Sequence, residues 1–400
     1  MKRILFISGS MGLGHIIRDI AIANKIACVN ENVKIIWLAN GPAAKEIKRV
    51  GGVLHKRWEE FADLNTEAES VVKGFSLRLP DYGRVSRPRW ESNYRLFCNI
   101  LSYEEYDVAV GDETYGIWFH LDNLHDKIKT PFVMIYDFVG FSYLTFMQRL
   151  RNLLHGKKST NEQQSQDHKR IKAGKNSVLF IGENEDISDS RFGFLLPNRR
   201  RYAQKHYFLI GYVLNFTPGA IPDRNRLKKV LGYGDNPLII CAIGGTSVGR
   251  QILDLCSRAY VYVKDEIPDL QMVLVCGPRL DPASIIVSGG IEVKGYVPKL
   301  YEHFAASDLV ITQAGGTATL ELTALKVPFI YFPIEGHEEQ ETHVSKRLER
   351  HQAGVKMLFK NTDPLRLAQK VLQNINKPVS SVSIPIDGAQ KAAEIICSFL

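Results

Sequence analysis

The strongest indication of chemistry in the sequence is a pair of glycines, Gly315–Gly316, within the stretch Ser307–Gln340. The apolar run Leu309–Thr312 precedes the pair and predicts a strand, and Thr317–Leu325 follows it with helical spacing. A glycine turn between a strand and a helix exposes backbone N–H groups, and the helix dipole favours negative charge there. We therefore expect Gly315, Gly316 and Thr317 to bind an anion.

An acidic side chain lies next to this turn. Glu321 is about one helical turn beyond Thr317, so its carboxylate shares the helix face that points at the anion. A second strand, Val327–Phe332, leads into the polar loop Glu338–Gln340. Phosphate with a carboxylate acceptor nearby suits a sugar nucleotide, whose diphosphate would lie on the turn and whose ribose hydroxyls would bind the acid.

A second candidate phosphate turn comes earlier in the chain. The sequence Gly244-Gly245-Thr246-Ser247 follows the apolar strand Leu238–Ile243. Two glycines and two hydroxyls at a helix start form a plausible phosphate cradle. An ordinary strand-to-helix turn is the alternative interpretation.

The first glycine-rich turn carries a histidine instead of a dinucleotide signature. Its glycines, Gly9, Gly12 and Gly14, have the spacing GxxGxG rather than GxGxxG, and no acidic residue closes the second strand, so NAD binding is weakly indicated. His15 stands at the following helix start, where the dipole lowers an imidazole pKa and favours the neutral base. It could deprotonate a hydroxyl nucleophile, or it could merely cap its helix.

Acidic residues follow two other predicted strands. Asp112 ends the strand Val108–Gly111 and could orient His15, or it could cap the next helix. Glu113 is adjacent and could take the same role. Asp137, after the strand Phe132–Tyr136, is a weaker candidate.

These turns are positioned by an alternation of strands and helices, which predicts parallel sheets with crossover helices. A Gly/Pro/Asn-rich linker, Gly211–Pro222, separates two halves of comparable length. We predict domains over residues 1–212 and 213–380, followed by a helical segment 381–400 that could pack on either half. The further elements expected are strands Ile4–Ser8, Val33–Ala39, Val178–Ile181, Tyr207–Ile210 and Gln271–Val275, and helices Ile16–Val29, Pro42–Val50, Tyr115–Leu124, Arg224–Leu231, Gln251–Lys264 and Ala389–Leu400.

Open α/β sheets bind ligands at the carboxyl ends of their strands. Two such sheets that face each other would place His15 across a cleft from both phosphate turns. The net charge of +8 favours anionic partners without choosing among them. Nucleic-acid binding is poorly supported, because the cations are not interleaved with aromatic platforms.

The cysteines, the apolar segments and one basic segment limit the compartment and the membrane contacts that the sequence allows. The six cysteines are scattered without metal-type spacing, which suits a reducing cytosol. No segment reaches the roughly 18 apolar residues of a spanning helix. Gly156–Lys175 is polar and basic and predicts a mobile loop. Just before it, an apolar stripe from Phe146 to Leu154 flanked by arginines could rest on an anionic membrane, although a core-facing helix followed by a solvated loop is the favoured interpretation.

The combined motifs resemble the GT-B glycosyltransferases, and most closely the MurG-type N-acetylglucosaminyltransferases of peptidoglycan synthesis and their relatives. GLGHIIRDIAIA at Gly12–Ala23 looks like their GxGH turn and helix, and Val293–Glu321 looks like their donor-domain core. The resemblance covers most of the chain and is weakest over residues 55–105 and 140–205. It implies two Rossmann-like doubly wound domains that face a cleft.

The resemblance also implies residue roles. Gly315, Gly316 and Thr317 would hold the diphosphate, and Glu321 would bind the ribose. The first turn would contribute an acceptor base or a sugar-phosphate contact through His15. The other residues implied in donor binding are Gly12, Gly14, Gly244, Gly245, Thr246, Ser247, Tyr296, Val297, Gln313, Glu339 and Gln340.

Three departures from the family pattern matter. Gln313 stands where plant-type members have a phosphate-binding histidine, and Arg18 replaces a common proline. Glu339 replaces the commoner Asp or Gln, which leaves the sugar open.

The sequence thus predicts inverting transfer of a hexose or N-acetylhexosamine from a UDP-sugar to an acceptor hydroxyl, lipid-linked or on a glycan. No cofactor or metal is expected, since no DxD-type acidic pair is evident, and the expected location is the cytoplasm or the inner membrane face. Two alternatives stay open: a UDP-sugar hydrolase resembling the pseudaminic-acid pathway enzyme, which shares the GxGHxxR turn of Gly12–Arg18, and a non-catalytic sugar-nucleotide-binding subunit.

Overall fold

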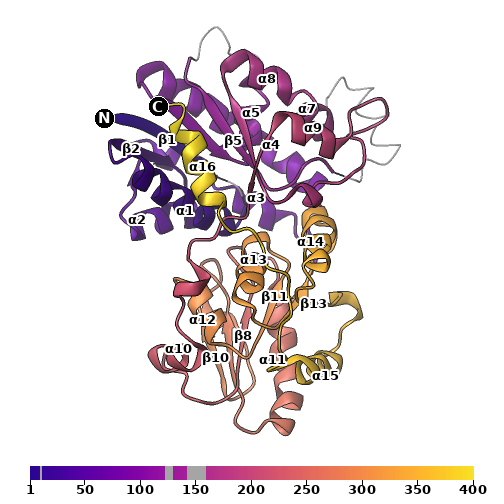
Figure 1. The fold of residues 1–400 in the computed structure, drawn as a ribbon. Coiled ribbons are helices and arrows are strands. Elements are labelled where there is room, and N and C mark those ends of the chain that lie inside the picture. Colours follow the sequence, from indigo (N-terminus) through magenta and orange to yellow (C-terminus); the bar gives the residue numbers. More distant parts are fainter. Residues whose placement is uncertain (10, 122–128, 142–158) are drawn as a thin grey trace.

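The computed structural model describes the chain except residues 10, 122–128 and 142–158. It contains two α/β domains, one above the other in Figure 1, each built on a parallel sheet. Almost every central strand is fully buried, because these apolar runs are covered by helices on both faces. The predicted fold class is thereby confirmed.

The N-terminal sheet has seven strands in the order β3-β2-β1-β4-β5-β6-β7. Its strands are β1 Lys2–Ser8, β2 Val33–Leu38, β3 Val53–Leu54, β4 Val108–Asp112, β5 Phe132–Tyr136, β6 Ser177–Ile181 and β7 Phe208–Gly211. Its helices are α1 Gly14–Val29, α2 Gly41–Arg49, α3 Leu64–Ser70, α4 Leu79–Tyr103, α5 Tyr115–Trp118, α7 Thr160–Gln164, α8 Asp167–Gly174 and α9 Arg199–His206, with 3₁₀ turns at Trp58–Glu60 and Asn184–Asp186.

The C-terminal sheet has six strands in the order β10-β9-β8-β11-β12-β13. Its strands are β8 Leu238–Ala242, β9 Gln271–Val275, β10 Ile291–Lys294, β11 Leu309–Gln313, β12 Phe329–Phe332 and β13 Val355–Lys356. Its helices are α10 Arg224–Val230, α11 Arg250–Glu266, α12 Leu300–Ala306, α13 Gly316–Leu325, α14 Ser345–Arg350 and α15 Pro364–Asn374. A π-helical turn spans Glu339–Val344, and 3₁₀ turns lie at Pro218–Ala220, Pro282–Ser284 and Phe359–Asn361.

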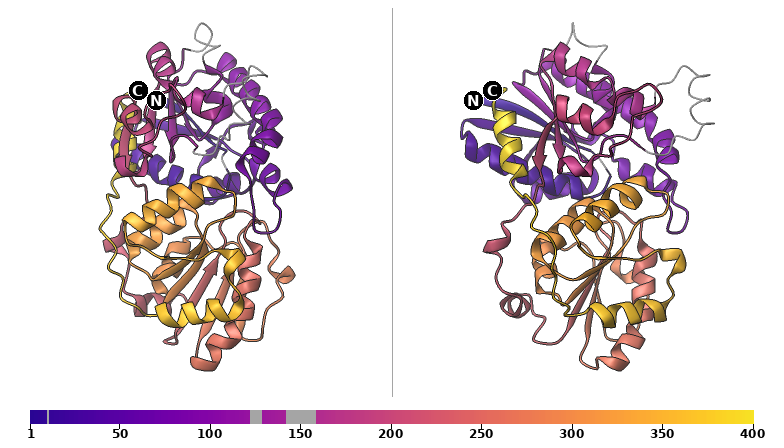
Figure 2. Two further views of the ribbon diagram at one scale, coloured as in Figure 1. Left: turned by 90° about the vertical axis from the view of Figure 1, so that its right-hand side faces the viewer. Right: turned by 45° about the vertical axis from the view of Figure 1, so that its right-hand side comes forward.

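The last helix, α16 (Gly388–Cys397), returns to the N-terminal domain and packs on α1. Both views of Figure 2 show it, in yellow, beside the N-terminal sheet. Its apolar face, including Ala392 and Ile396, is buried in the same cluster as Ile16 of α1. The chain therefore crosses between the domains twice, once before α10 and once before α16.

A short segment of the N-terminal domain also enters the C-terminal domain. Ser76 forms a parallel bridge with Glu335 of the C-terminal domain, and Leu77 N–H donates to the Glu335 carbonyl at 2.9 Å. Phe75 and Leu77 belong to the core of the C-terminal domain, where the Phe75 ring lies 4.6 Å from that of Phe359. We call Lys73–Leu77 the interdomain strap. No sequence pattern predicted it.

The structure differs from the sequence predictions in three places. No element was predicted between Val50 and Val108, a stretch that contains α4, a helix of 25 residues. Part of the predicted loop Gly156–Lys175 forms α7 and α8, because Asp167 and Arg170 make a fully buried ion pair at 2.9 Å. The predicted helix from Tyr115 is shorter than expected, since α5 ends at Trp118.

The stripe from Phe146 to Leu154 lies outside the described residues, so membrane contact stays a prediction. None of the helices that the structure describes is long and apolar enough to cross a bilayer.

Candidate active site

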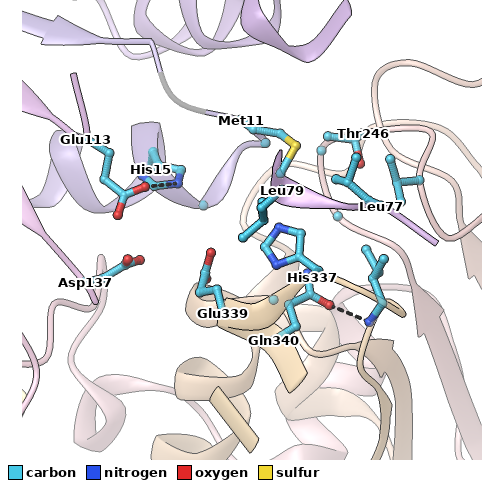
Figure 3. Close-up of a pocket in the computed structure, with 18 of the residues that line it drawn as sticks. Met11, His15, Leu77, Leu79, Glu113, Asp137, Thr246, His337, Glu339 and Gln340 are labelled. Atoms are coloured by element: carbon cyan, nitrogen blue, oxygen red, sulfur yellow. Dashed lines mark hydrogen bonds and ion pairs between the residues drawn. The ribbon is translucent and has the colours of Figure 1, made fainter. Parts of the chain in front are cut away.

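A cavity of about 1310 Å³ lies between the two domains and receives residues from both. Figure 3 shows His15 and Glu113 of the N-terminal domain facing Glu339 and His337 of the C-terminal domain. All the residues predicted for the site line the cavity except Asp112 and Ser247. Those that line it are Gly12, Gly14, His15, Glu113, Asp137, Gly244, Gly245, Thr246, Tyr296, Val297, Gln313, Gly315, Gly316, Thr317, Glu321, Glu339 and Gln340.

The two domains approach each other through glycines. A Cβ on Gly14 would lie 2.7 Å from Thr317 Oγ1, and a Cβ on Gly245 would collide with the backbone nitrogen of Leu13. A larger residue at Gly245 would push the domains apart, whereas one at Gly14 would require the Thr317 side chain to move. The sequence therefore places the histidine turn directly against both phosphate turns.

The turn before α13 is arranged to bind an anion. Gly315 is the N-cap of this ten-residue helix, and the space where its Cβ would be is open. The first-turn N–H groups of a helix have no intrahelical partners, and the dipole adds positive potential there. Arg347 donates to the Gly316 carbonyl at 3.1 Å and so fixes the turn.

The second turn is braced from inside. Gln313 at the end of β11 donates to the Ile243 carbonyl and so fixes the start of this turn against the neighbouring strand. The Ser247 N–H is not directed at the cavity, because it donates to Glu69 of the N-terminal domain at 2.9 Å. Arg279 holds the same Glu69 carboxylate at 2.7 Å. In this structure Gly244, Gly245 and Thr246 face the cavity, and Ser247 serves the contact between domains.

The expected nucleoside region is formed by Glu321 and Tyr296. Glu321 lines the cavity while only 7% exposed, and burial raises the pKa of its carboxyl to about 8. It is therefore protonated near neutral pH and can donate one hydrogen bond and accept others. Tyr296 reaches across the cleft, where its hydroxyl donates to Glu46 on α2.

His15 lies against Asp112, which is one of the two placements that the sequence left open for Asp112. Ser8 of β1 pairs with Asp112 of β4, which brings the two strand ends together, and His15 Nδ1 is 3.1 Å from Asp112 Oδ2. Asp112 is completely buried and also forms a bidentate ion pair with Arg18, at 2.7 and 2.6 Å. Burial opposes ionisation, but Arg18 and His15 outweigh it and hold the pKa of Asp112 at about 2.

Arg18 was seen in the sequence only as a departure from the family pattern. It is three residues beyond His15 and so shares its helix face. Its Nη1 donates to Asp137 Oδ2 at 2.5 Å, and its Nη2 lies 2.8 Å from His15 Nδ1. Arginine can only donate a hydrogen bond, so Nδ1 must be unprotonated to accept from Arg18, whereas it must carry a proton to donate to Asp112. The two contacts therefore exclude each other at any one moment.

The other imidazole nitrogen faces a second carboxyl. Glu113 Oε2 lies 3.9 Å from His15 Nε2, and Tyr115 donates to Glu113 Oε1 at 3.2 Å. Glu113 has a φ of +47°, a strained value for a non-glycine residue and a common sign of a functional site. Burial and the neighbouring Asp137 raise the pKa of Glu113 well above its usual range.

The site therefore contains carboxyls in two protonation states. Burial opposes ionisation of Asp137, but Arg18 keeps its pKa low. Burial and Asp137 raise the pKa of Glu339, on the opposite domain, to about 8. Carboxyls whose environments push their pKa values apart can divide acid and base roles between them. Besides Arg18, the sequence interpretation missed His337, which nothing but its place in the EGHEEQ loop could have suggested.

Comparison with known proteins finds a family similarity in the C-terminal half. Residues 239–393 match the glycosyltransferase family 28 C-terminal domain. An uncharacterized glycosyltransferase of Methanopyrus kandleri is 26% identical over 194 residues, covering 48% of this chain and 54% of that protein. An uncharacterized glycosyltransferase of Methanosarcina acetivorans is 22% identical over 387 residues, covering 94% and 89%.

The UDP-N-acetylglucosamine–N-acetylmuramyl-(pentapeptide) pyrophosphoryl-undecaprenol N-acetylglucosamine transferase of Carboxydothermus hydrogenoformans is 26% identical over 185 residues, covering 44% of this chain and 47% of that protein. The chain thus aligns with about half the length of two of these three relatives.

Solved structures agree on the fold. The glycotransferase of kitacinnamycin superposes with a TM-score of 0.57 at 14% identity, covering 100% of this chain and 99% of that one. The calicheamicin glycosyltransferase CalG4 does so with a TM-score of 0.56 at 16% identity, covering 100% and 95%. The protein therefore has the GT-B fold, and its residues 239–393 are similar to the C-terminal domain of glycosyltransferase family 28.

Proposed function

We propose that this protein is a glycosyltransferase that moves a hexose or an N-acetylhexosamine from a UDP-sugar to an acceptor hydroxyl, with inversion and without a metal ion. The cavity shared by His15 and the N-terminus of α13 is the observation that carries this proposal. It would hold a donor diphosphate on one domain within reach of a proton acceptor on the other. The relatives named above support the reaction class.

The reaction would proceed by one displacement. The acceptor hydroxyl loses its proton to His15, and its oxygen attacks the anomeric carbon. The bond between that carbon and the diphosphate oxygen breaks, and UDP leaves. The N–H groups of Gly316 and Thr317 stabilise the charge that grows on the leaving diphosphate. A single displacement inverts the anomeric configuration.

The acceptor side of the cavity has an aromatic wall. The rings of Tyr82 and Trp90 lie 6.3 Å apart, and those of Tyr115 and Phe138 are also 6.3 Å apart. Aromatic faces suit the apolar faces of sugar rings and apolar chains alike. Either a glycan or a lipid-linked acceptor fits this wall, and we place the reaction in the cytoplasm or at the inner face of its membrane.

Hydrolysis of the UDP-sugar is the second candidate. Arg18 of the GxGHxxR turn clamps Asp112 and Asp137 beside His15, so water held by this cluster could replace the acceptor. Incubation of the purified protein with UDP-sugars separates these functions. Rapid release of free sugar without an acceptor supports hydrolysis, whereas UDP release that depends on an added acceptor and persists in EDTA supports metal-free transfer. If the purified protein turns over no UDP-sugar under either condition, the remaining interpretation is a protein that binds sugar nucleotides without catalysis.

A thermal-shift screen over nucleotide sugars should come first. A ligand that binds only the folded state raises its melting temperature by mass action. Stabilisation by one UDP-sugar above UDP alone would identify the donor. The absence of any shift with UDP compounds would contradict the proposal.

A further inference from the structure

His337 lines the cavity, and neither of its ring nitrogens has a hydrogen-bond partner among the described residues. The residue is only 2% exposed. Its backbone is fixed on both sides, because its N–H donates to Ile334 at 3.2 Å and its carbonyl accepts from Glu341 at 2.9 Å. In Figure 3 its ring points into the cavity between Leu79 and Gln340.

Such a side chain is costly unless a molecule in the cavity, substrate or water, pairs with it. A buried donor or acceptor without a partner loses its hydration and gains nothing in return, and native proteins satisfy nearly all such groups. His343 provides a comparison: it is also buried with an unpaired Nε2, but it packs against Phe138 at 5.7 Å and does not line the cavity. Only the His337 ring, of these two, can meet a bound substrate.

The charge state of His337 limits which ligand group it suits. Burial lowers the pKa of its imidazole to about 4, so the ring is neutral at physiological pH. A neutral imidazole has one N–H donor and one acceptor nitrogen. A phosphate offers only acceptors and would leave one nitrogen unpaired. A hydroxyl or an amide both donates and accepts, and these groups occur on sugars.

The neighbours of His337 place it beside the sugar rather than the nucleotide. It precedes Glu339 and Gln340, the residues expected to contact the transferred sugar. The Gln340 Oε1 already accepts from the Ile334 N–H at 3.0 Å, which uses one of its two lone pairs within the protein. Leu77 of the interdomain strap, fully buried, and Leu79 line the same region with apolar groups. The neutral His337 ring adds both a donor and an acceptor to this region of the cavity.

We propose that His337 hydrogen-bonds a hydroxyl or an amide of the transferred sugar and thereby selects the sugar of the donor, an inference that rests on the proposed function. The test measures binding of UDP, UDP-glucose and UDP-N-acetylglucosamine by calorimetry. The variants are His337→Phe, which keeps the ring shape, and His337→Asn and His337→Gln, whose amides approximate the Nδ1 and Nε2 positions. His343→Phe is the matched control.

We expect His337→Phe to weaken binding of the UDP-sugar that the wild type prefers by about tenfold or more, while UDP affinity stays within about twofold. The ligand-free variant should melt at a higher temperature than the wild type, because two unpaired buried nitrogens are gone. A purely structural histidine would give the opposite shift. One of the two amide variants should recover part of the affinity, and His343→Phe should bind every ligand like the wild type.

Two results would overturn the inference. One is unchanged UDP-sugar affinity in His337→Phe, and the other is an equal loss of UDP affinity, which would place the residue at the nucleotide. If His337→Phe does not fold, the amide variants provide the test. Wild-type affinity for the UDP-sugar in both His337→Asn and His337→Gln would show that neither ring nitrogen contacts the sugar. A wild type that binds neither UDP nor a UDP-sugar contradicts the proposed function, and this inference then fails with it.

Discussion

Arg18 is expected to hold the N-terminal half of the site together electrostatically, so its removal should be strongly destabilising. Arg18 is 6% exposed, and its two carboxylate partners, Asp112 and Asp137, are 0% and 10% exposed. Removing one partner of a buried ion pair leaves an uncompensated charge and costs about 3–5 kcal/mol. Arg18→Gln should therefore lower the free energy of unfolding by about that amount, or the melting temperature of the N-terminal domain by about 6–20 °C.

The deficit should depend on pH in a defined direction. In the wild type the pKa of Asp112 is about 2, below its unfolded value, so its stabilisation is present above about pH 4 and is lost as pH falls through 2. In Arg18→Gln burial raises the pKa of Asp112, and protonation relieves the buried charge. The difference between the two proteins should therefore be largest at pH 7 and shrink toward pH 4.

Urea unfolding of the wild type, Arg18→Gln, Asp112→Asn and the double variant at pH 7 and pH 4.5 measures both effects. Asp112→Asn in the Arg18→Gln background removes the uncompensated charge, so the cycle should give a coupling of about 2 kcal/mol. The reasoning would be refuted by Arg18→Gln within about 1 kcal/mol of the wild type at pH 7, with parallel pH profiles.

Two further predictions concern Glu321 and the interdomain strap. The raised pKa of Glu321, about 8, means that its stabilising effect is complete below about pH 4 and is lost as pH rises toward 8. The free energy of unfolding of Glu321→Gln relative to the wild type should therefore rise by about 2–3 kcal/mol between pH 5 and pH 7; a relative gain that is larger at pH 5 would contradict this. Phe75 is 6% exposed in the core of the C-terminal domain, so Phe75→Ala should lower the free energy of unfolding by about 3–5 kcal/mol. Scanning calorimetry should then show the C-terminal domain melting earlier although the change lies in the N-terminal half, and an unshifted C-terminal transition would argue against the strap.

The fold and the outline of the site were predictable because they depend on local patterns. Buried parallel strands such as Leu309–Gln313 are continuous apolar runs, and glycine turns follow them directly. The proximity of His15 and Asp112 could be inferred because both follow carboxyl ends of strands in one sheet. Because ligands bind at the carboxyl ends of parallel strands, a binding cleft between the two sheets could also be predicted.

The remainder depends on contacts between distant residues that no local pattern encodes. Arg18 acts through carboxylates 94 and 119 residues away. The strap carries only two buried apolar residues, Phe75 and Leu77, whose partners lie in the other domain. Helix α4 was obscured by an internal proline, Pro88, and α8 by charges that turn out to be paired and buried.

His15 provides the most direct test of the central claim, that a base on the N-terminal domain acts on a donor bound to the C-terminal domain. Turnover of the preferred UDP-sugar and affinity for UDP should be measured for the wild type and for His15→Ala. We predict that His15→Ala loses turnover by about a hundredfold or more, while its UDP affinity is retained, because the nucleotide contacts belong to the other domain. Near-normal turnover, or a loss of UDP affinity that accounts for the lost rate, would contradict the account.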